Sequence, residues 1–177
     1  MFTAGRDPVQ RREEEQRGKI EEKTLSTAPN LSRCLKNMPA GWLTGICYWL
    51  RIKPAPRRQE REQQIIKSLL MKDRLDKLIR DNVKAEEEAL LRYLLANDGW
   101  ARLSVVSRKF GSLQGEGFYW EDEPPGSPLG VLWSIGLVGV GKAHLEKRRE
   151  KIVAIPVELR QPLSEILASE GFKWPMN

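Results

Sequence analysis

The chain of 177 residues carries 30 Lys and Arg against 24 Asp and Glu, so its net charge is +6, and 40% of its residues are hydrophobic. This length suits one ordinary domain or two small ones with a workable core. No apolar run approaches the ~18 residues of a membrane span. The N-terminus also lacks the apolar stretch of a signal peptide, so we expect a cytoplasmic protein.

Cysteine and histidine usage argues against a disulfide framework and against a Cys/His metal site. Cys34 and Cys47 are thirteen positions apart, and the single histidine, His144, lies far along the chain. This spacing matches neither pattern. We therefore expect two reduced, mostly buried thiols and no bound cofactor.

The positive charge is concentrated in the second quarter of the chain. Residues 31–82 hold twelve basic and five acidic side chains, a surplus of seven, whereas residues 83–137 hold five basic and eight acidic ones. A smaller basic cluster lies near Lys147–Lys151. Such clustering favours a polyanionic partner, most often nucleic acid, although basic residues that merely solvate helix surfaces give the same pattern.

Residues 1–30 and the segment that follows them differ in apolar content. Residues 1–30 have few apolar side chains and contain the mixed-charge run RREEEQRGKIEEK, which predicts a disordered or loosely helical tail. A short helix is then predicted from Leu31 to Met38, capped by Asn30 and ended by Pro39. A second helix is predicted over Ala40–Leu50.

The chain must run extended after this second helix. Lys53 and Ala55 each precede a proline, and this disfavours helical backbone. Ile52 is an isolated apolar residue that we expect to seat this linker on the core. A basic helix follows from Arg57, with the buried stripe Ile65, Ile66, Leu69 and Leu70, and a further turn or two ends at Asp81-Asn82.

The second block, residues 83–170, is predicted as three helices, a two-stranded hairpin and a last short helix. The three helices are VKAEEEALLRYLLANDG, WARLSVVSRKFG and LGVLWSIG, the third with Ser127 as cap and Pro128 at its first position. An acidic loop, residues 111–126, precedes the third helix. The strands are LVGVGKAHL and KIVAIPVEL around the turn EKRRE, RQPLSEILASEG is the last helix, and residues 171–177 are a tail.

Three helices followed by a hairpin is the order of a winged helix-turn-helix domain. The run SPLGVLWSIGLVGVGKAHLEKRREKIVAIPVELRQPL resembles the winged-helix module of XPB-type DNA helicases and of related stand-alone bacterial proteins. This resemblance covers roughly residues 83–167 and implies binding of duplex DNA, with the third helix in the major groove and the wing on the backbone.

The third helix departs from that expectation because it has no basic side chain with which to read bases. The acidic residues Glu121, Asp122 and Glu123 precede it and would repel phosphates. The wing tip can still contact phosphates, through Lys147, Arg148, Arg149 and Lys151. An alternative use is a protein-interaction adaptor, which would dock a partner through Trp133, Glu121 and Asp122.

The first block carries a second resemblance. LKNMPAGWLTGICYWLRIKPAPRRQEREQQIIKSLL resembles the helix-extension-helix of the SAP domain and of the N-terminal domain of the Rho termination factor. The likeness spans about 36 residues within a module that we expect at residues 31–82, and the glycine usual in the linker is replaced here by Pro54 and Pro56. It implies a small helical module that binds nucleic acid.

The start of the basic helix suits phosphate. A helix N-terminus offers free N–H groups and the positive end of the helix dipole, and nearby guanidinium groups add charge-assisted hydrogen bonds. Those arginines oppose the dipole unless an anion sits there. We therefore expect phosphate contacts from Lys53, Arg57, Arg58 and Arg61. The aromatic side chains Trp42, Tyr48 and Trp49 either stack bases or pack in the core.

Enzyme signatures are missing from the sequence. It has no GxxxxGK[ST] phosphate loop and no Ser/His/Asp arrangement that its one histidine completes. We expect a mainly α protein of the α+β class, without catalytic activity, that binds nucleic acid with weak sequence selectivity, DNA rather than RNA. The rival expectation is the adaptor.

Overall fold

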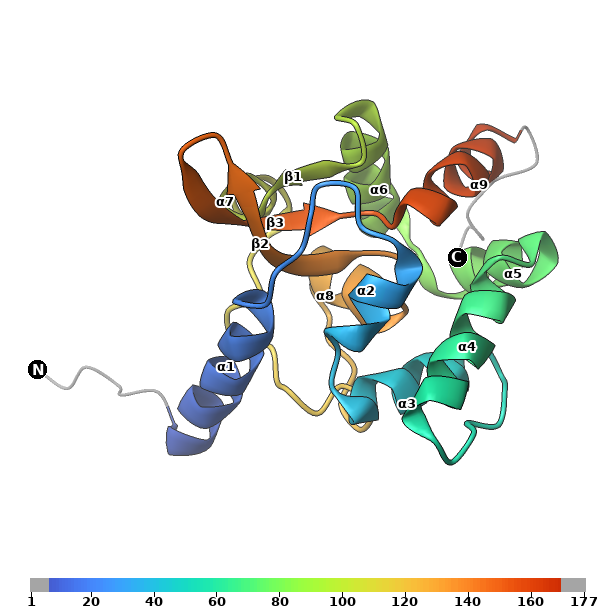
Figure 1. Cartoon of the computed structure of the whole chain (residues 1–177), viewed down its shortest axis with the longest axis horizontal. Coiled ribbons are helices and arrows are strands. Elements are labelled where there is room, and N and C mark those ends of the chain that lie inside the picture. The colour runs from blue at the N-terminus through green and yellow to red at the C-terminus, as the bar shows by residue number, and fades with distance from the viewer. Residues whose placement is uncertain (1–6, 170–177) are drawn as a thin grey trace, which may run out of the picture.

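The computed structural model describes residues 7–169, so the predicted tail 171–177 and residues 1–6 lie outside the described residues. In the described range the chain forms nine helices and three strands, as Figure 1 shows. Their bounds are α1 Pro8–Glu21, α2 Leu31–Lys36, α3 Ala40–Trp49, α4 Arg58–Leu69, α5 Lys72–Asn82, α6 Ala85–Ala96, β1 Trp100–Arg102, α7 Leu103–Phe110, α8 Pro128–Ser134, β2 Gly139–Leu145, β3 Arg148–Ala154 and α9 Val157–Ala168. The expected class, mainly helical with a small sheet, is confirmed.

The sheet is antiparallel, with β3 between β1 and β2. The pair β2–β3 is a hairpin whose register places Leu145 opposite Arg148, so Glu146 and Lys147 form the turn. The predicted turn EKRRE was therefore too long, since Arg148 already belongs to β3. The hairpin projects beyond the end of the short β1, at the upper left of Figure 1.

The strand β1 corrects the prediction of one helix from Trp100 to Phe110. Asp98 and Gly99 have φ angles of 61° and 84°, so the chain reverses after α6 and reaches the edge of the sheet. Trp100 and Ala101 then pair with Ala154 and Val153 of β3. This pairing across the fold outweighs the helical preference of the segment, and the helix starts only at Leu103.

The end of β3 also differs from the prediction, which extended that strand to Leu159. The strand stops at Ala154, and Val157 begins α9. Pro156 has no N–H to donate to a neighbouring strand, and its fixed φ of −53° suits the position before a helix. The predicted caps of the other helices are confirmed: Asn30 accepts from Arg33 N, and Ser127 accepts from Gly130 N.

One hydrophobic core runs through both of the predicted modules. Its buried members extend from Ile20 to Leu167 and include side chains from α2, α3, α4, α5, α6, α8 and α9. At its centre Trp42 stacks on Trp120 at 4.0 Å, and Trp133 meets Trp42 edge-on at 4.8 Å. Because Trp42 comes from the first predicted module and the other two from the second, the boundary at residue 82 is crossed by shared packing.

The predicted N-terminal tail is an ordered part of the fold from residue 7 onward. Arg17 of α1 is 5% exposed and donates to Glu116 O at 2.5 Å. Residues 22–30, here called the arm, then run beside β2, where Leu25 N donates to Lys142 O and Lys142 N donates to Lys23 O, both at 2.8 Å. Two of the few apolar residues of the predicted tail, Ile20 and Leu25, are buried and anchor it, whereas Val9 is exposed.

Gly141 permits this close approach of the arm. A Cβ at that position would overlap Lys23 O and the Leu25 side chain. The last glycine of GLVGVGKA therefore serves backbone packing against the arm.

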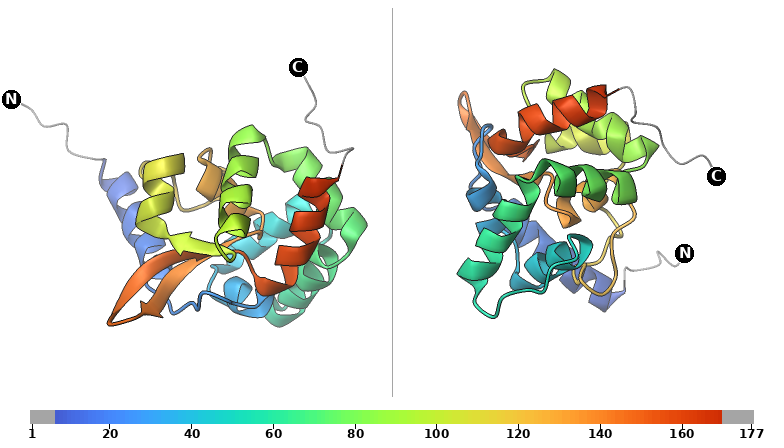
Figure 2. Two further views of the ribbon diagram at one scale, coloured as in Figure 1. Left: turned by 90° about the horizontal axis from the view of Figure 1, so that it is seen from above. Right: turned by 90° about the vertical axis from the view of Figure 1, so that its right-hand side faces the viewer.

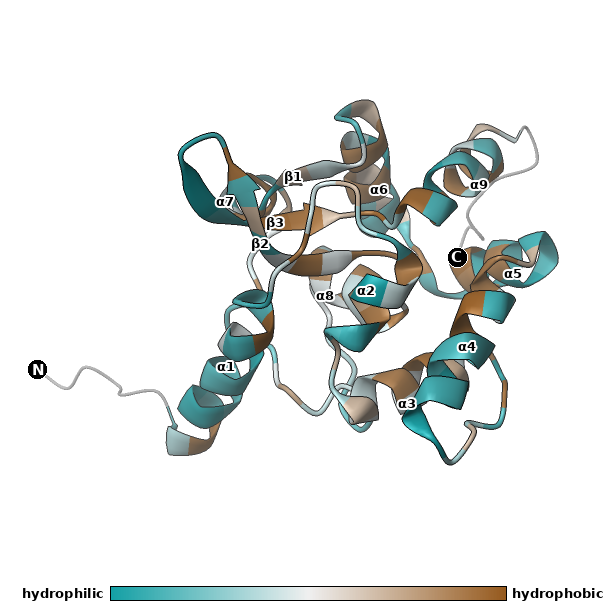
Figure 3. Cartoon of the chain, viewed as in Figure 1, coloured by the Kyte–Doolittle hydropathy of each residue, from teal (hydrophilic) through white to brown (hydrophobic). Residues whose placement is uncertain are grey.

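Hydrophobic residues face the interior and polar ones the surface. Figure 3 shows α1 mostly hydrophilic, and brown colour gathered on the strands and on the inner sides of the helices. None of the helices within residues 7–169 is long and apolar enough to cross a membrane.

Candidate nucleic-acid interface

The α3–α4 linker is held in one extended path. Ile52 N donates to Cys47 O at 3.0 Å, and the Ile52 side chain packs against the core, as predicted. Gln64 of α4 contacts the linker twice, because its Oε1 accepts from Ala55 N at 2.8 Å and its Nε2 donates to Lys53 O at 3.1 Å. The linker is therefore fixed by side chains of the helix that follows it.

Arg58 has an internal role. Its Nη2 donates to Leu35 O and Lys36 O at 3.1 Å each and to Met38 O at 2.5 Å. These carbonyls lie at and just after the C-terminal end of α2, where the dipole is negative and backbone acceptors lack the usual helical partner, although Leu35 O also accepts from Met38 N. The guanidinium at the start of α4 thus complements the end of another helix. This contact offsets the unfavourable position of Arg58 at the positive end of its own helix dipole.

Arg61 is used in the same way. Its Nε donates to Ala55 O at 3.1 Å, and its Nη2 donates to Pro56 O at 3.3 Å. Its Nη1 reaches Thr44 Oγ1 on α3 at 3.3 Å. Arg61 therefore joins the linker to α3, and its hydrogen-bonding capacity is largely occupied.

Two of the four predicted contacts remain available at this end. Lys53 and Arg57 are exposed, and no hydrogen bond or ion pair of either side chain is found among residues 7–169. Two residues of the same region join them: Tyr48, predicted either to stack bases or to pack in the core and here 72% exposed, and Arg51, which the sequence did not single out and whose side chain is 72% exposed. We call Tyr48, Arg51, Lys53 and Arg57 the linker surface.

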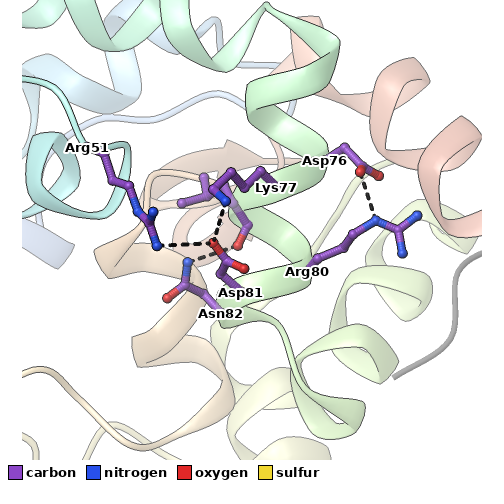
Figure 4. A network of polar contacts seen from close by, with 7 residues as sticks. Arg51, Asp76, Lys77, Arg80, Asp81 and Asn82 are labelled. Atoms are coloured by element: carbon purple, nitrogen blue, oxygen red, sulfur yellow. Dashed lines mark hydrogen bonds and ion pairs between the residues drawn. The ribbon is translucent and has the colours of Figure 1, made fainter. Parts of the chain in front are cut away.

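Arg51 has a loose acidic neighbour. Its Nη2 is 4.0 Å from Asp81 Oδ2, and Lys77 Nζ lies 3.9 Å from the same oxygen, as Figure 4 shows. Both distances are long and the side chains are exposed, so these pairs contribute little. Arg51 also has a φ of 58°, a left-handed conformation at the end of α3.

The aromatic side chains divide as follows. Trp42 is 1% exposed and donates from Nε1 to Phe118 O at 2.7 Å, so it is a core residue. Trp49 is half-buried, and Tyr48 meets it edge-on at 5.1 Å. Tyr48 is therefore the one of these three with an exposed ring.

At the hairpin, most cations have partners. Lys142 Nζ lies 2.6 Å from Glu22, and Lys151 Nζ lies 3.8 Å from Glu21. Arg149 donates to Thr24 Oγ1 at 2.9 Å, and Arg148, 80% exposed, pairs with Glu150 at 3.0 Å. Lys147, in the turn, is exposed.

Hydrogen bonding to Lys142 lowers the pKa of Glu22, and hydrogen bonding to Arg102 lowers the pKa of Glu150. Both shifts indicate that these carboxylates are ionised partners of Lys142 and Arg102.

The two basic regions lie at opposite ends of the molecule. In Figure 1 the hairpin tip is at the upper left and the α3–α4 linker at the lower right, and both views of Figure 2 keep them apart. The structure does not bring Lys53 and Arg57 together with Lys147, Arg148 and Arg149. A short ligand therefore cannot contact both regions at once.

The partner-docking residues of the adaptor hypothesis are placed differently from one another. Trp133 is 1% exposed inside the tryptophan cluster, so the expectation that it docks a partner is wrong. The rest of α8 is buried too, apart from the half-buried Val131. Glu121 and Asp122 are exposed, and a Cβ on Gly41 would overlap the Glu121 carboxylate, which thus lies over the first turn of α3.

The thiols are buried and free of disulfides. Burial raises the pKa of Cys34 to about 12 and also raises the pKa of Cys47. Within residues 7–169 no group of three or more His, Cys, Asp and Glu side chains is placed to hold a metal ion.

Comparison of the chain with protein-family models, with curated proteins and with solved structures returned no match.

Proposed function

We propose that the protein binds nucleic acid without catalysis, through the linker surface and mainly by contacts to the phosphate backbone. The observation that carries this proposal is the exposure of Lys53 and Arg57 without internal partners among the described residues, on the linker that follows the helix of the exposed Tyr48. Cations track the backbone and an aromatic ring stacks a base, which is how single-stranded nucleic acid is commonly held.

The charge around the linker supports the proposal. Residues 24–59 contain no Asp or Glu, so the chain itself supplies no carboxylate across this stretch. The first acidic side chain, Glu60, lies in the first turn of α4. Asp81 of α5 lies near Arg51, but the chain segment that carries Lys53 and Arg57 has no acid of its own, and such clustering of cations attracts a polyanion.

The rigidity of the linker supports it as well. Gln64 and Arg61 fix the backbone on which Lys53 and Arg57 are carried. A surface ordered before binding loses less conformational entropy when the ligand arrives. The SAP-like and Rho-like resemblance is consistent with such a surface at a helix-extension-helix.

The second half of the chain contributes less in this proposal. The order α6, β1, α7, α8, β2, β3 with β3 in the middle of the sheet supports a winged helix. However, α8 is enclosed, so it presents no side chains to a major groove. We therefore propose weak sequence selectivity, with DNA tested before RNA, and at most an auxiliary phosphate contact from Lys147 and Arg148.

A salt-titrated gel shift with single-stranded DNA, duplex DNA and RNA tests the proposal. We expect the double substitution Lys53→Glu with Arg57→Glu to weaken binding and to reduce the salt slope by roughly one unit for each lost contact. The control is Lys19→Glu with Lys67→Glu, two exposed cations elsewhere, which changes the net charge equally.

The control variant should keep most of the affinity. Equal losses in the two double variants would show that only net charge matters, and the absence of binding by the unmodified protein at low salt would refute the proposal.

A further inference from the structure

A groove of about 710 Å³ lies on the molecule where the end of α3, the junction of α5 and α6, the 124–126 turn and α8 meet. Its apolar lining includes Trp49, Val131 and Ile135. Asp81 and Glu87 contribute carboxylates to the lining. This volume is within the range of small-ligand sites.

Glu87 is unusual among the groove residues. It is 6% exposed, and its carboxylate has no hydrogen bond or ion pair with any residue in the range 7–169. The Glu87 oxygens are not among the side-chain atoms that are fully buried without a partner, so they keep some contact with solvent. A carboxylate with so little access to water and no partner is still unfavourable. A cation entering the groove would supply the missing partner.

The position of Glu87 in its helix does not explain this burial. It is the third residue of α6, where a negative charge favours the helix dipole. The neighbouring Glu86 is in the same turn and is exposed, so it provides this benefit without loss of hydration. The low exposure of Glu87 is therefore not explained by the helix dipole.

The remaining lining matches an organic cation. The described residues that line the groove include three carboxylates, Asp81, Glu86 and Glu87, and one amine, the exposed Lys84. Asp81 has cationic neighbours outside the groove, Arg51 and Lys77, so the carboxylates left for a ligand are those of Glu86 and Glu87. The half-buried ring of Trp49 adds a surface that attracts ammonium and guanidinium groups. The apolar wall of Val131 and Ile135 suits an aliphatic stem.

We propose that this groove binds an alkylammonium or guanidinium group carried on an apolar stem, with Glu87 as the anion that meets the charge. This binding does not rest on the nucleic-acid proposal, although the groove borders the linker surface, where Arg51 lies 4.0 Å from Asp81 and Tyr48 packs against Trp49. The cation belongs either to a free amine or to a basic side chain of a peptide, and the two sources share the same chemistry.

Titration of the isotopically labelled full chain, followed by NMR, tests the proposal. We expect n-butylammonium to shift the amides of the first turn of α6 and the indole of Trp49, and n-butanol to bind at least about tenfold more weakly, because hydrogen bonds to charged groups are the stronger ones. Blocked lysine (N-acetyl-lysine methylamide) binding tighter than n-butylammonium assigns the groove to a peptide, and the reverse assigns it to a free amine. Equal binding of n-butylammonium and n-butanol overturns the proposal.

Substitution separates a ligand role from a structural one. Glu87→Gln should abolish the preference for the cation and leave the melting temperature unchanged or raised. Glu60→Gln is the matched control, because Glu60 is the exposed third residue of α4, and it should leave cation binding intact. Trp49→Leu should weaken the binding severalfold.

Two results contradict the proposal. If Glu87→Gln retains the preference for n-butylammonium over n-butanol, the carboxylate does not meet the cation. If Glu87→Gln lowers the melting temperature markedly while Glu60→Gln does not, the carboxylate has an internal structural partner. Failure of the nucleic-acid test leaves both of these outcomes unaffected.

Discussion

The two basic ends of the molecule use their cations differently. At the α3–α4 linker, Arg58 and Arg61 are bound to backbone carbonyls, and Lys53 and Arg57 remain exposed without internal partners among the described residues. At the hairpin, carboxylates supplied mainly by α1 and the arm, with Glu150 of β3, neutralise the cations nearest the sheet.

This difference shows that spacing in the sequence does not tell which cation is available. Arg57 and Arg58 are adjacent and of one type, yet one caps the end of α2 and the other faces solvent. What decides is which acceptor the fold brings near each guanidinium. Substitutions at the two basic ends test this division between internally bonded and exposed cations.

Substitution of Arg58 should have the largest effect on stability. Arg58→Ala removes the side-chain donor of three carbonyls at and after the end of α2, of which Leu35 O keeps Met38 N. We expect a loss of about 2–4 kcal/mol in the free energy of unfolding. Arg57→Ala is the matched control and should change stability by less than about 0.5 kcal/mol. Urea denaturation measures both, and equal effects would break the division between the neighbouring arginines.

Substitution of Gln64 should have an intermediate effect. Gln64→Ala removes the two hydrogen bonds to the linker, and we expect a loss of about 1–2 kcal/mol. Hydrogen exchange of the Ala55 amide should accelerate, and nucleic-acid affinity should fall although no charge is lost. Gln63→Ala, at an exposed neighbour, should do neither. A linker whose exchange is unchanged would argue against positioning by Gln64.

The ion pairs at the hairpin should have the smallest effect, and it should depend on pH. Glu22 has a pKa below its ordinary value of 4.5 because of Lys142. Its contribution to stability is therefore present above pH 4.5 and is lost as the pH falls through the lower pKa of the folded state. Glu22→Gln should remove part of the acid-side decrease in melting temperature, whereas Glu123→Gln should not. An identical acid-side decrease in wild type and Glu22→Gln would mean that the pair contributes nothing.

Local features of the fold were predictable from the sequence. The caps Asn30 and Ser127, the extended path imposed by Pro54 and Pro56, and the seating of Ile52 follow from the preferences of single residues and short spacings. These preferences act within a few positions along the chain, so no tertiary information is required.

Features that depend on distant contacts were not predictable. Strand β1 exists because β3 offers it a partner, and α1 is placed because the arm bonds to β2 across Gly141. The burial of Trp133 likewise follows from Trp42 and Trp120, far away in the sequence. The exposure of Tyr48 did have a signal, since it lies off the helix face formed by Leu43, Ile46, Cys47 and Leu50.

The most direct test of the account compares the two ends in one assay. Binding of single-stranded and duplex DNA is measured against salt for Lys53→Glu with Arg57→Glu and for Lys147→Glu with Arg148→Glu, which change the net charge equally. The account predicts the larger loss of affinity and the larger decrease in salt slope, roughly one unit for each contact, for the linker pair. A larger loss for the hairpin pair would contradict it.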